Sequence, residues 1–437
     1  MSETDFEFLI NKIGHIIAKQ DTNMRKCIPV KERLAVALRF LATGDSYASL
    51  SYLFKISPQS VSKCVDEVCS ALIDSLKEEI KFVEAIDERP DEKWMENVEI
   101  MKEKTDKRLI RGYEVQEVRD LVNVVNKKQK KMAMLTMYEA DNERMKKMFE
   151  MIEGEENVSF NALLAMLPTR ANEWMNTAND FQNKWNYPHC LGAIDGKHIV
   201  IKSPDHSGSE FYNYKGTFSI VLLAVVDANY SFIYVDVGCQ GRISDGGVFR
   251  NSSFFKKLFK NELHLPSDNT LPNKDEPIPY VFVGDDAFPL SNNLMKPYSG
   301  IHNKGSKERI FNYRLSRARR IVENAFGILS SVFRVLRKPI LLSPHKTTNI
   351  VMCCTLLHNF LKRSETSRYF YAPNGTFDSE ENGELQSGSW RNNDNESTSM
   401  LPFRRVARRP GVEASNIRDR FANYFKTIDV LPWQNEC

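Results

Sequence analysis

The chain has 437 residues, more than one compact core usually organises, so we expect two or three structural units. Hydrophobic residues make up 42% of it, enough for a buried core, and 60 basic residues nearly cancel 57 acidic ones. A net charge of +3 therefore neither indicates nor excludes a nucleic-acid partner. The eight cysteines form no C-x-x-C pair and no array at zinc spacing, which indicates reduced thiols in an intracellular protein.

Neither a secretory signal nor a membrane span is expected. The start, MSETDFEFLINKIGHII, carries acidic side chains where a signal peptide has basic ones. The most apolar stretch, residues 218–238, is interrupted by Asp227, Asn229 and Asp236, which indicates a pair of strands. The composition therefore favours a soluble protein.

Residues 31–83 are predicted to be helical. An apolar stripe runs to Gly44, a suitable C-terminal stop. A short helix over YASLSYLF, a three-residue connection and a longer helix follow, and Ser57 and Pro58 suit the start of the longer helix. This is the order of a helix-turn-helix, and an ordinary three-helix bundle is the alternative. If the region binds DNA, the residues that could reach base edges are Gln59, Ser60, Ser62 and Lys63.

The next segment, residues 84–165, is dense in mixed charge and has little sustained apolar face. Solvated helices of unknown role are predicted there. Strand patterns begin after residue 166, and helical stretches are interspersed among them. A sheet with helices on its faces is the expected architecture. The strands are predicted over residues 191–201, 218–226, 230–238 and 280–285.

The C-terminal part, residues 367–437, is predicted to be a polar and partly disordered tail. Residues 371–400 are rich in Gly, Asn and Ser and lack the apolar residues of a packed core, so we predict disorder there. Residues 415–434 regain apolar residues at helical spacing, which predicts a helix that docks on the core. The tract RRVARR at 404–409 suits a nuclear-import signal or a DNA contact.

Three carboxylates are candidates for a metal-dependent phosphoryl-transfer site, since divalent ions held by a few carboxylates can activate water and stabilise a leaving oxygen. Asp195 lies within a predicted strand, although Asp-Gly also suits a turn. Asp285 follows Val281 and Val283 in phase at the end of a strand, where a capping role is the alternative. Glu323 borders the apolar stripe of a helix, where a salt bridge to a neighbouring arginine is the alternative.

Basic residues surround Glu323. Between Lys304 and Lys338 there are ten basic residues and two acidic ones, which favours a phosphate-backbone partner over a merely solvated helix. The candidate DNA contacts in this region are Arg314, Arg317, Arg319 and Arg320.

Five strings in order resemble the nuclease domain of PIF/Harbinger-type DDE transposases and the Harbinger-derived nucleases. They are CLGAIDGKHI, VDVGCQGRISDGGVF, VGDDAFPL, YRLSRARRIVENAFGIL and CCTLLHNF. The resemblance covers about residues 166–366, and LRFLATGDSYASLSYLFKIS is similar to the family's N-terminal helix-turn-helix region. The interposed segment 84–165 departs from the family pattern.

The resemblance implies an α/β fold of the RNase H-like type, a mixed β-sheet flanked by helices. It implies that Asp195, Asp285 (rather than Asp286) and Glu323 are catalytic and hold two Mg²⁺ or Mn²⁺ ions. Asp245 and His358 lie in family-typical motifs; Asp245 has no assigned role, and His358 is expected to be a packing residue.

The leading interpretation is a nuclear DDE nuclease and transposase that cleaves DNA and transfers a 3′-hydroxyl end. The resemblance also implies a separate Myb-like DNA-binding partner, and a homo-oligomer is compatible with it. Two alternatives stay open. One is a nuclease without strand transfer, and the other is a host-adapted protein that keeps the fold and binds DNA or chromatin.

Overall fold

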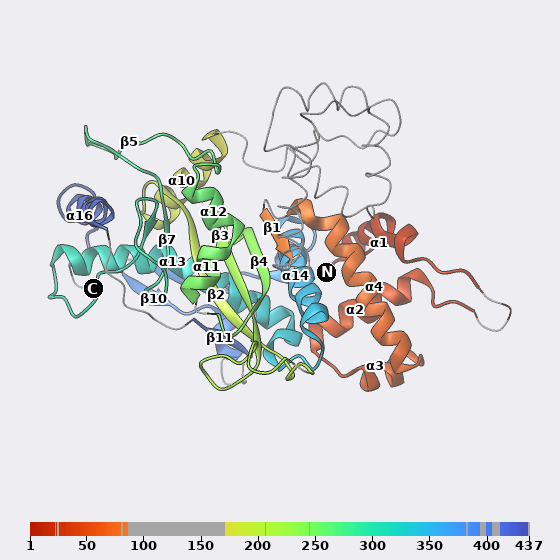
Figure 1. Ribbon diagram of the computed structural model, residues 1–437. Coiled ribbons are helices and arrows are strands. Elements are labelled where there is room, and N and C mark those ends of the chain that lie inside the picture. Colours follow the sequence, from red (N-terminus) through yellow and green to blue (C-terminus); the bar gives the residue numbers. More distant parts are fainter. Residues whose placement is uncertain are drawn as a thin grey trace, which may run out of the picture. The chain divides into compact units, whose positions relative to one another are not determined.

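Figure 1 shows the computed structural model of the chain, in which the described residues on the two sides of the charged segment belong to the same unit. The residues described are 1–21, 23, 26–79, 82–85, 171–205, 207–243, 245–381, 383–393, 399–403 and 411–435. The predictions for the charged segment after Ala85 and for the tract 404–409 lie outside the described residues.

A mixed sheet forms the centre, and seven strands of the described residues belong to it, in the order β1-β4-β3-β2-β7-β8 with β11 beside β2. Strands β2, β3 and β4 are antiparallel neighbours, whereas β7 runs parallel to β2 and β8 parallel to β7. The bounds are β1 Phe82–Ala85, β2 Cys190–Val200, β3 Ser219–Val226, β4 Phe232–Gln240, β7 Val281–Val283, β8 Leu294–Met295 and β11 Met400–Pro402. The four predicted strand segments are thereby confirmed.

Helices cover both faces of the sheet because successive side chains of the central strands are buried on alternate sides. One core cluster includes α11 (Asp245–Asn251) and α12 (Ser253–Phe259). The other includes α13 (Lys307–Val332) and α14 (Pro344–Arg363), and α10 (Ala171–Trp185) contributes to both. A mixed sheet between helical layers is consistent with the expected RNase H-like fold.

The N-terminal helices are α1 (Glu3–Ile17), α2 (Val30–Thr43), α3 (Tyr47–Phe54) and α4 (Pro58–Leu76). The predicted end signals are confirmed: Gly44 ends α2 in the left-handed region, and the Ser57 hydroxyl accepts a hydrogen bond from the backbone N–H of Ser60. Helix α4 packs against α14 and shares its hydrophobic core, so these helices are continuous with the sheet domain.

The predicted disorder of 371–400 is wrong for the described part of that segment. It contains strands β9 (Ser379–Glu381) and β10 (Glu384–Gln386) and the 3-10 helix η4 (Ser389–Asn393). The carboxylate of Glu380 is buried and pairs with Arg320 at 2.6 Å. Polar residues are ordered here because their charges are neutralised by the core helix rather than by water.

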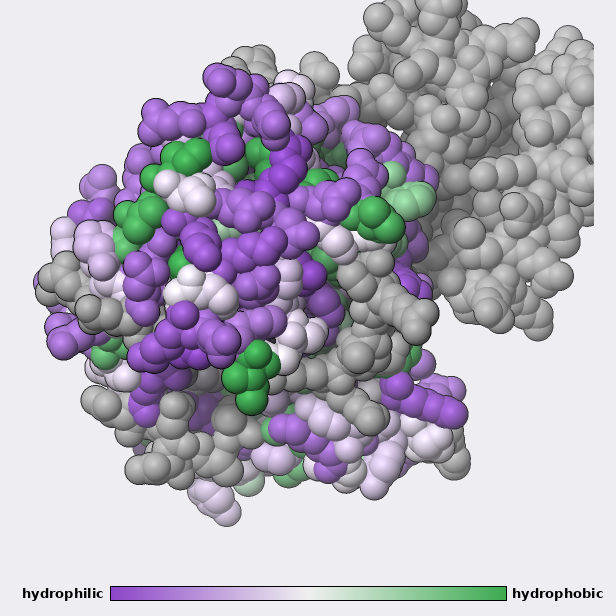
Figure 2. Space-filling model, turned by 90° about the vertical axis from the view of Figure 1, so that its left-hand side faces the viewer, coloured by the Kyte–Doolittle hydropathy of each residue, from purple (hydrophilic) through white to green (hydrophobic). Residues whose placement is uncertain are grey.

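The remaining elements are short, apart from α16 (Val412–Thr427), which packs on α13 as predicted. The short elements are η1 Lys77–Glu79, β5 Asn269–Thr270, β6 Pro277–Ile278, η3 Arg334–Arg337 and α15 Arg368–Tyr371. Among the described helices, none has the length and apolar character to cross a bilayer. Figure 2 shows one face, which is mainly hydrophilic with scattered apolar residues.

Candidate active site

Asp195 lies in the middle of β2, with its side chain almost fully buried. The strand pairs without interruption through this point, and Asp195 is opposite Ala224 of β3. The alternative of a turn at Asp195–Gly196 is therefore wrong. Glycine is required at 196 for another reason: a Cβ there would lie 2.1 Å from the ring of Phe403.

Asp285 is brought beside Asp195 by strand register. Ala193 of β2 is paired in parallel with Val283, the last residue of β7, and Asp195 and Asp285 each follow this pair by two residues. The Asp285 Oδ1 accepts a hydrogen bond from the backbone N–H of Ala287 at 2.9 Å. Burial, and then the charge of Asp195, raises the pKa of Asp285.

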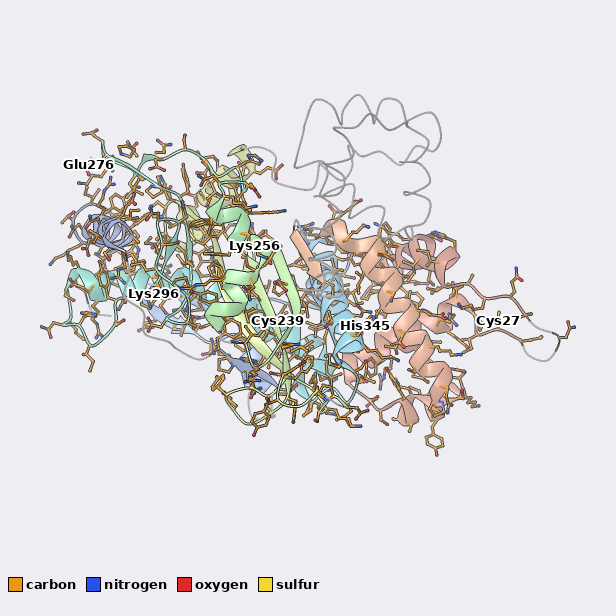
Figure 3. The ribbon with its side chains drawn as sticks, in the orientation of Figure 1. Cys27, Cys239, Lys256, Glu276, Lys296 and His345 are labelled. Carbon is orange, nitrogen blue, oxygen red and sulfur yellow. The ribbon has the colours of Figure 1, made fainter. Side chains whose placement is uncertain are left out.

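Asp286 has a different neighbour. Its Oδ1 lies 3.9 Å from the Nζ of Lys296, the residue that follows β8 and is labelled in Figure 3. The prediction that only one of the two adjacent aspartates joins the cluster agrees with this geometry, and that residue is Asp285.

Glu323 reaches the same place from α13, which packs against β2 and β7. As the alternative interpretation expected, it forms an ion pair with Arg319 one turn earlier. Burial works to lower the pKa of Arg319, but the charges of Glu323, Asp195 and Asp285 outweigh it and raise that pKa. The guanidinium of Arg319 thus lies within electrostatic reach of all three carboxylates.

A second cation lies beside the carboxylates. The Nζ of Lys197 is 3.1 Å from Asp195 Oδ2 and lies over the ring of Phe326. Sequence reasoning missed this residue as part of the site, although its position two residues after Asp195 in a strand was a usable signal.

The donor set suits a hard divalent cation, since carboxylate oxygens are the ligands that Mg²⁺ and Mn²⁺ prefer. In the described residues, however, no three His, Cys, Asp or Glu side chains are already arranged to hold a metal ion. The carboxylate charges are balanced instead by Lys197 and Arg319.

The predicted DNA contacts on α13 need correction. Arg314 is wrong because its side chain is fully buried, where it donates to the Asn186 carbonyl at 2.6 Å and pairs with Asp429. Arg317 is wrong because it is buried near Glu380. Arg320 pairs with the same carboxylate. Three of the basic residues on α13 therefore pair with carboxylates of the C-terminal part of the chain, Glu380 and Asp429, instead of lying free on the surface.

The candidate base-reading residues of α4 differ in exposure. Gln59 and Lys63 are exposed at its first turns, whereas the Ser60 hydroxyl lies 3.0 Å from that of Ser57 within the cap. Ser62 accepts a hydrogen bond from Lys346 of α14 at 3.3 Å, so it faces the protein rather than solvent.

The two family-typical residues without a catalytic role are also located. Asp245 begins α11, and its side chain is outside the description. His358 is fully buried, with Nδ1 2.7 Å from the Tyr371 hydroxyl and Nε2 2.8 Å from the Tyr230 carbonyl, in agreement with the predicted packing role.

Comparison with known proteins shows what this sheet region is similar to. Residues 194–359 match the family described as DDE superfamily endonuclease. The matched range begins one residue before Asp195 and includes Asp285 and Glu323, so all three carboxylates lie inside it.

Two relatives show how far the similarity extends. The chain is 30% identical over 195 residues to "Protein ALP1-like" of Arabidopsis thaliana, and 28% identical over 185 residues to the human protein named "Putative nuclease HARBI1". The matches cover 43% and 41% of this chain and 48% of each relative, so the chain spans about half the length of the curated relatives it matches. No solved structure matches the chain. The resemblance of the endonuclease domain to Harbinger-derived nucleases is confirmed.

Proposed function

We propose that the protein is a metal-dependent DNA endonuclease and transposase of the Harbinger type. What supports the proposal most is the position of Arg319, which pairs with Glu323 and whose pKa is raised by the charges of Glu323, Asp195 and Asp285, three carboxylates remote in sequence. Such a group of hard oxygen donors suits phosphodiester chemistry with two divalent ions.

The three carboxylates would hold Mg²⁺ or Mn²⁺, which supplies Lewis-acid stabilisation of the phosphate and a nucleophilic water when bound. The protein itself determines where the carboxylate oxygens lie. The paired part of β2 and β7 ends two residues before Asp285, and α13, which packs against both strands, carries Glu323. The hydrogen bond from the backbone N–H of Ala287 to Asp285 Oδ1 orients the carboxylate of Asp285.

DNA is the proposed substrate. The exposed residues Gln59 and Lys63 at the start of α4 would read or hold the duplex, and Arg334 and Lys338 are exposed basic residues able to meet phosphates. We also propose that the protein acts in the nucleus, that it works with a separate Myb-like DNA-binding protein, and that it can associate with itself.

The test is nicking of supercoiled plasmid by the full chain with Mn²⁺, with and without EDTA. Asp195→Asn, Asp285→Asn and Glu323→Gln should each reduce the nicking rate by at least about a hundredfold. Glu262→Gln removes an exposed carboxylate outside the site and should keep the wild-type rate. Wild-type nicking by Asp195→Asn would refute the assignment.

Strand transfer needs its own experiment. A labelled duplex with a free 3′-hydroxyl, supplied with target plasmid and a Myb-like partner, should become joined to the plasmid by the wild-type protein. Nicking without joining would favour a nuclease without strand transfer. DNA binding without either reaction would favour the host-adapted binding protein.

A further inference from the structure

Two cations are built into the carboxylate cluster by the same elements that carry the acids. Lys197 follows Asp195 by two residues on the same face of β2, and Arg319 precedes Glu323 by one turn of α13. Their backbones therefore stay close to the acids they neutralise, while their long side chains can move their charged ends.

Both cations are largely withdrawn from water. The Lys197 side chain is 18% exposed and that of Arg319 is 20% exposed, compared with 33% for Glu323. Separating Lys197 from Asp195, or Arg319 from Glu323, therefore costs free energy, because a carboxylate with little access to water needs a compensating charge. Such a charge comes from within the chain as long as no metal is bound.

We propose that Lys197 and Arg319 are internal counter-ions that compete with divalent metal for the carboxylates, so that metal binding requires Arg319 to release Glu323. This inference rests on the proposed function, since it concerns the affinity of that same site for its metal. Below a threshold concentration of metal, the carboxylates stay paired with Lys197 and Arg319, and above it the metal replaces these two cations.

The direction of the effect follows from charge. An arginine side chain near the carboxylates repels an incoming divalent cation and occupies one of its ligands. Removal of the arginine should therefore tighten metal binding, although it leaves Glu323 without its partner in the metal-free protein. A residue with a purely structural role would not produce tighter binding.

The same helix offers a matched control. Arg320 is the next residue and forms an ion pair of the same kind, but with Glu380 of the tail. Arg320→Gln should lower the melting temperature of the metal-free protein, as Arg319→Gln should, because each removes an ion pair from the same helix. Only Arg319→Gln should change metal affinity.

The experiment is calorimetric titration of the full chain with Mn²⁺, together with melting curves in EDTA. We expect Arg319→Gln to bind Mn²⁺ about tenfold more tightly than wild type, and Arg320→Gln to bind it with the wild-type constant. Lys197→Met, of similar volume, should also tighten binding and serves if Arg319→Gln fails to fold. Unchanged or weaker affinity in both site variants would overturn the inference.

Failure of the metal site itself has a separate signature. If Asp195→Asn binds Mn²⁺ as wild type does, the proposed site is wrong, and the inference is overturned with it. If Asp195→Asn loses binding while Arg319→Gln and Lys197→Met gain nothing, the competition alone is wrong and the proposed function stands.

Discussion

At the scale of single residues, the role of a charged side chain depends on what covers it. Asp195 is in phase with an apolar strand pattern, so its burial followed from the sequence, whereas Asp285 lies beyond the end of β7 and is half-buried. Arg314 and Arg317 were misread because local sequence shows a charge but not what covers it. Their partners, Asp429 and Glu380, lie 115 and 63 positions further along the chain.

The buried His358 makes stability depend on pH. Burial lowers its pKa to about 3, while in the unfolded chain it titrates near 6.5. Between these values the unfolded chain binds more protons, so the free energy of unfolding should fall by up to about 1.4 kcal/mol for each unit of acidification. The loss begins as the pH drops below about 6.5.

Urea unfolding of the full chain between pH 7 and pH 5 measures this dependence. His358→Gln should be less stable at pH 7 because it disturbs two hydrogen bonds, but its stability should change less with pH. His345→Gln on the same helix removes an exposed imidazole, labelled in Figure 3, and should keep the wild-type slope. Equal slopes in wild type and His358→Gln would contradict the explanation.

At the scale of elements, the predicted helices and strands appear where periodicity and caps agree. The prediction failed at Phe82–Ala85, expected to be helical but forming strand β1 beside β4, and in the tail. Composition treats polar residues as solvated, whereas Glu380 is only 2% exposed beside Arg317 and Arg320. The Tyr313 hydroxyl also donates to it. The carboxylate of Glu380, shared by Arg317 and Arg320, holds the tail against α13. This pairing joins residues far apart in sequence, so no local pattern predicts it.

Loss of the Glu380 charge should therefore destabilise the protein strongly. Glu380→Gln leaves two buried guanidinium groups without their anion, which costs about 3 kcal/mol by comparison with other buried pairs. Chemical denaturation with tryptophan fluorescence measures the change, and Trp433, whose ring lies 5.8 Å from the guanidinium of Arg317, reports it. Glu384→Gln alters an exposed residue of β10 and should cost less than about 0.5 kcal/mol. A similar small loss in Glu380→Gln would show that the tail is held by other contacts.

At the scale of the whole molecule, the sequence indicated separate helical and nuclease regions, and the structure joins them. Helix α4 and helix α14 share a core that includes Cys69 and Cys353. Polar contacts cross the same boundary: Lys346 pairs with Asp66 at 2.6 Å, and Asn359 donates to the Glu79 carbonyl at 2.6 Å. The contact between the helical region and the sheet region could not be predicted. Helix α14 has buried residues on every side, and its neighbours α4 and β4 are distant from it in sequence.

Removal of the N-terminal helices should thus damage the endonuclease domain itself. A chain that begins at residue 166 would expose the face of α14 that α4 covers, and exposed apolar surface of this kind promotes aggregation. We expect residues 166–437 expressed alone to be largely insoluble, and co-expression of residues 1–79 as a separate chain to restore soluble, co-purifying protein. Soluble fractions and size-exclusion profiles measure this outcome. A monomeric 166–437 fragment with the melting temperature of the full chain would mean that the helical region is an independent module, and the DNA-binding role proposed for α4 would then need no coupling to the sheet.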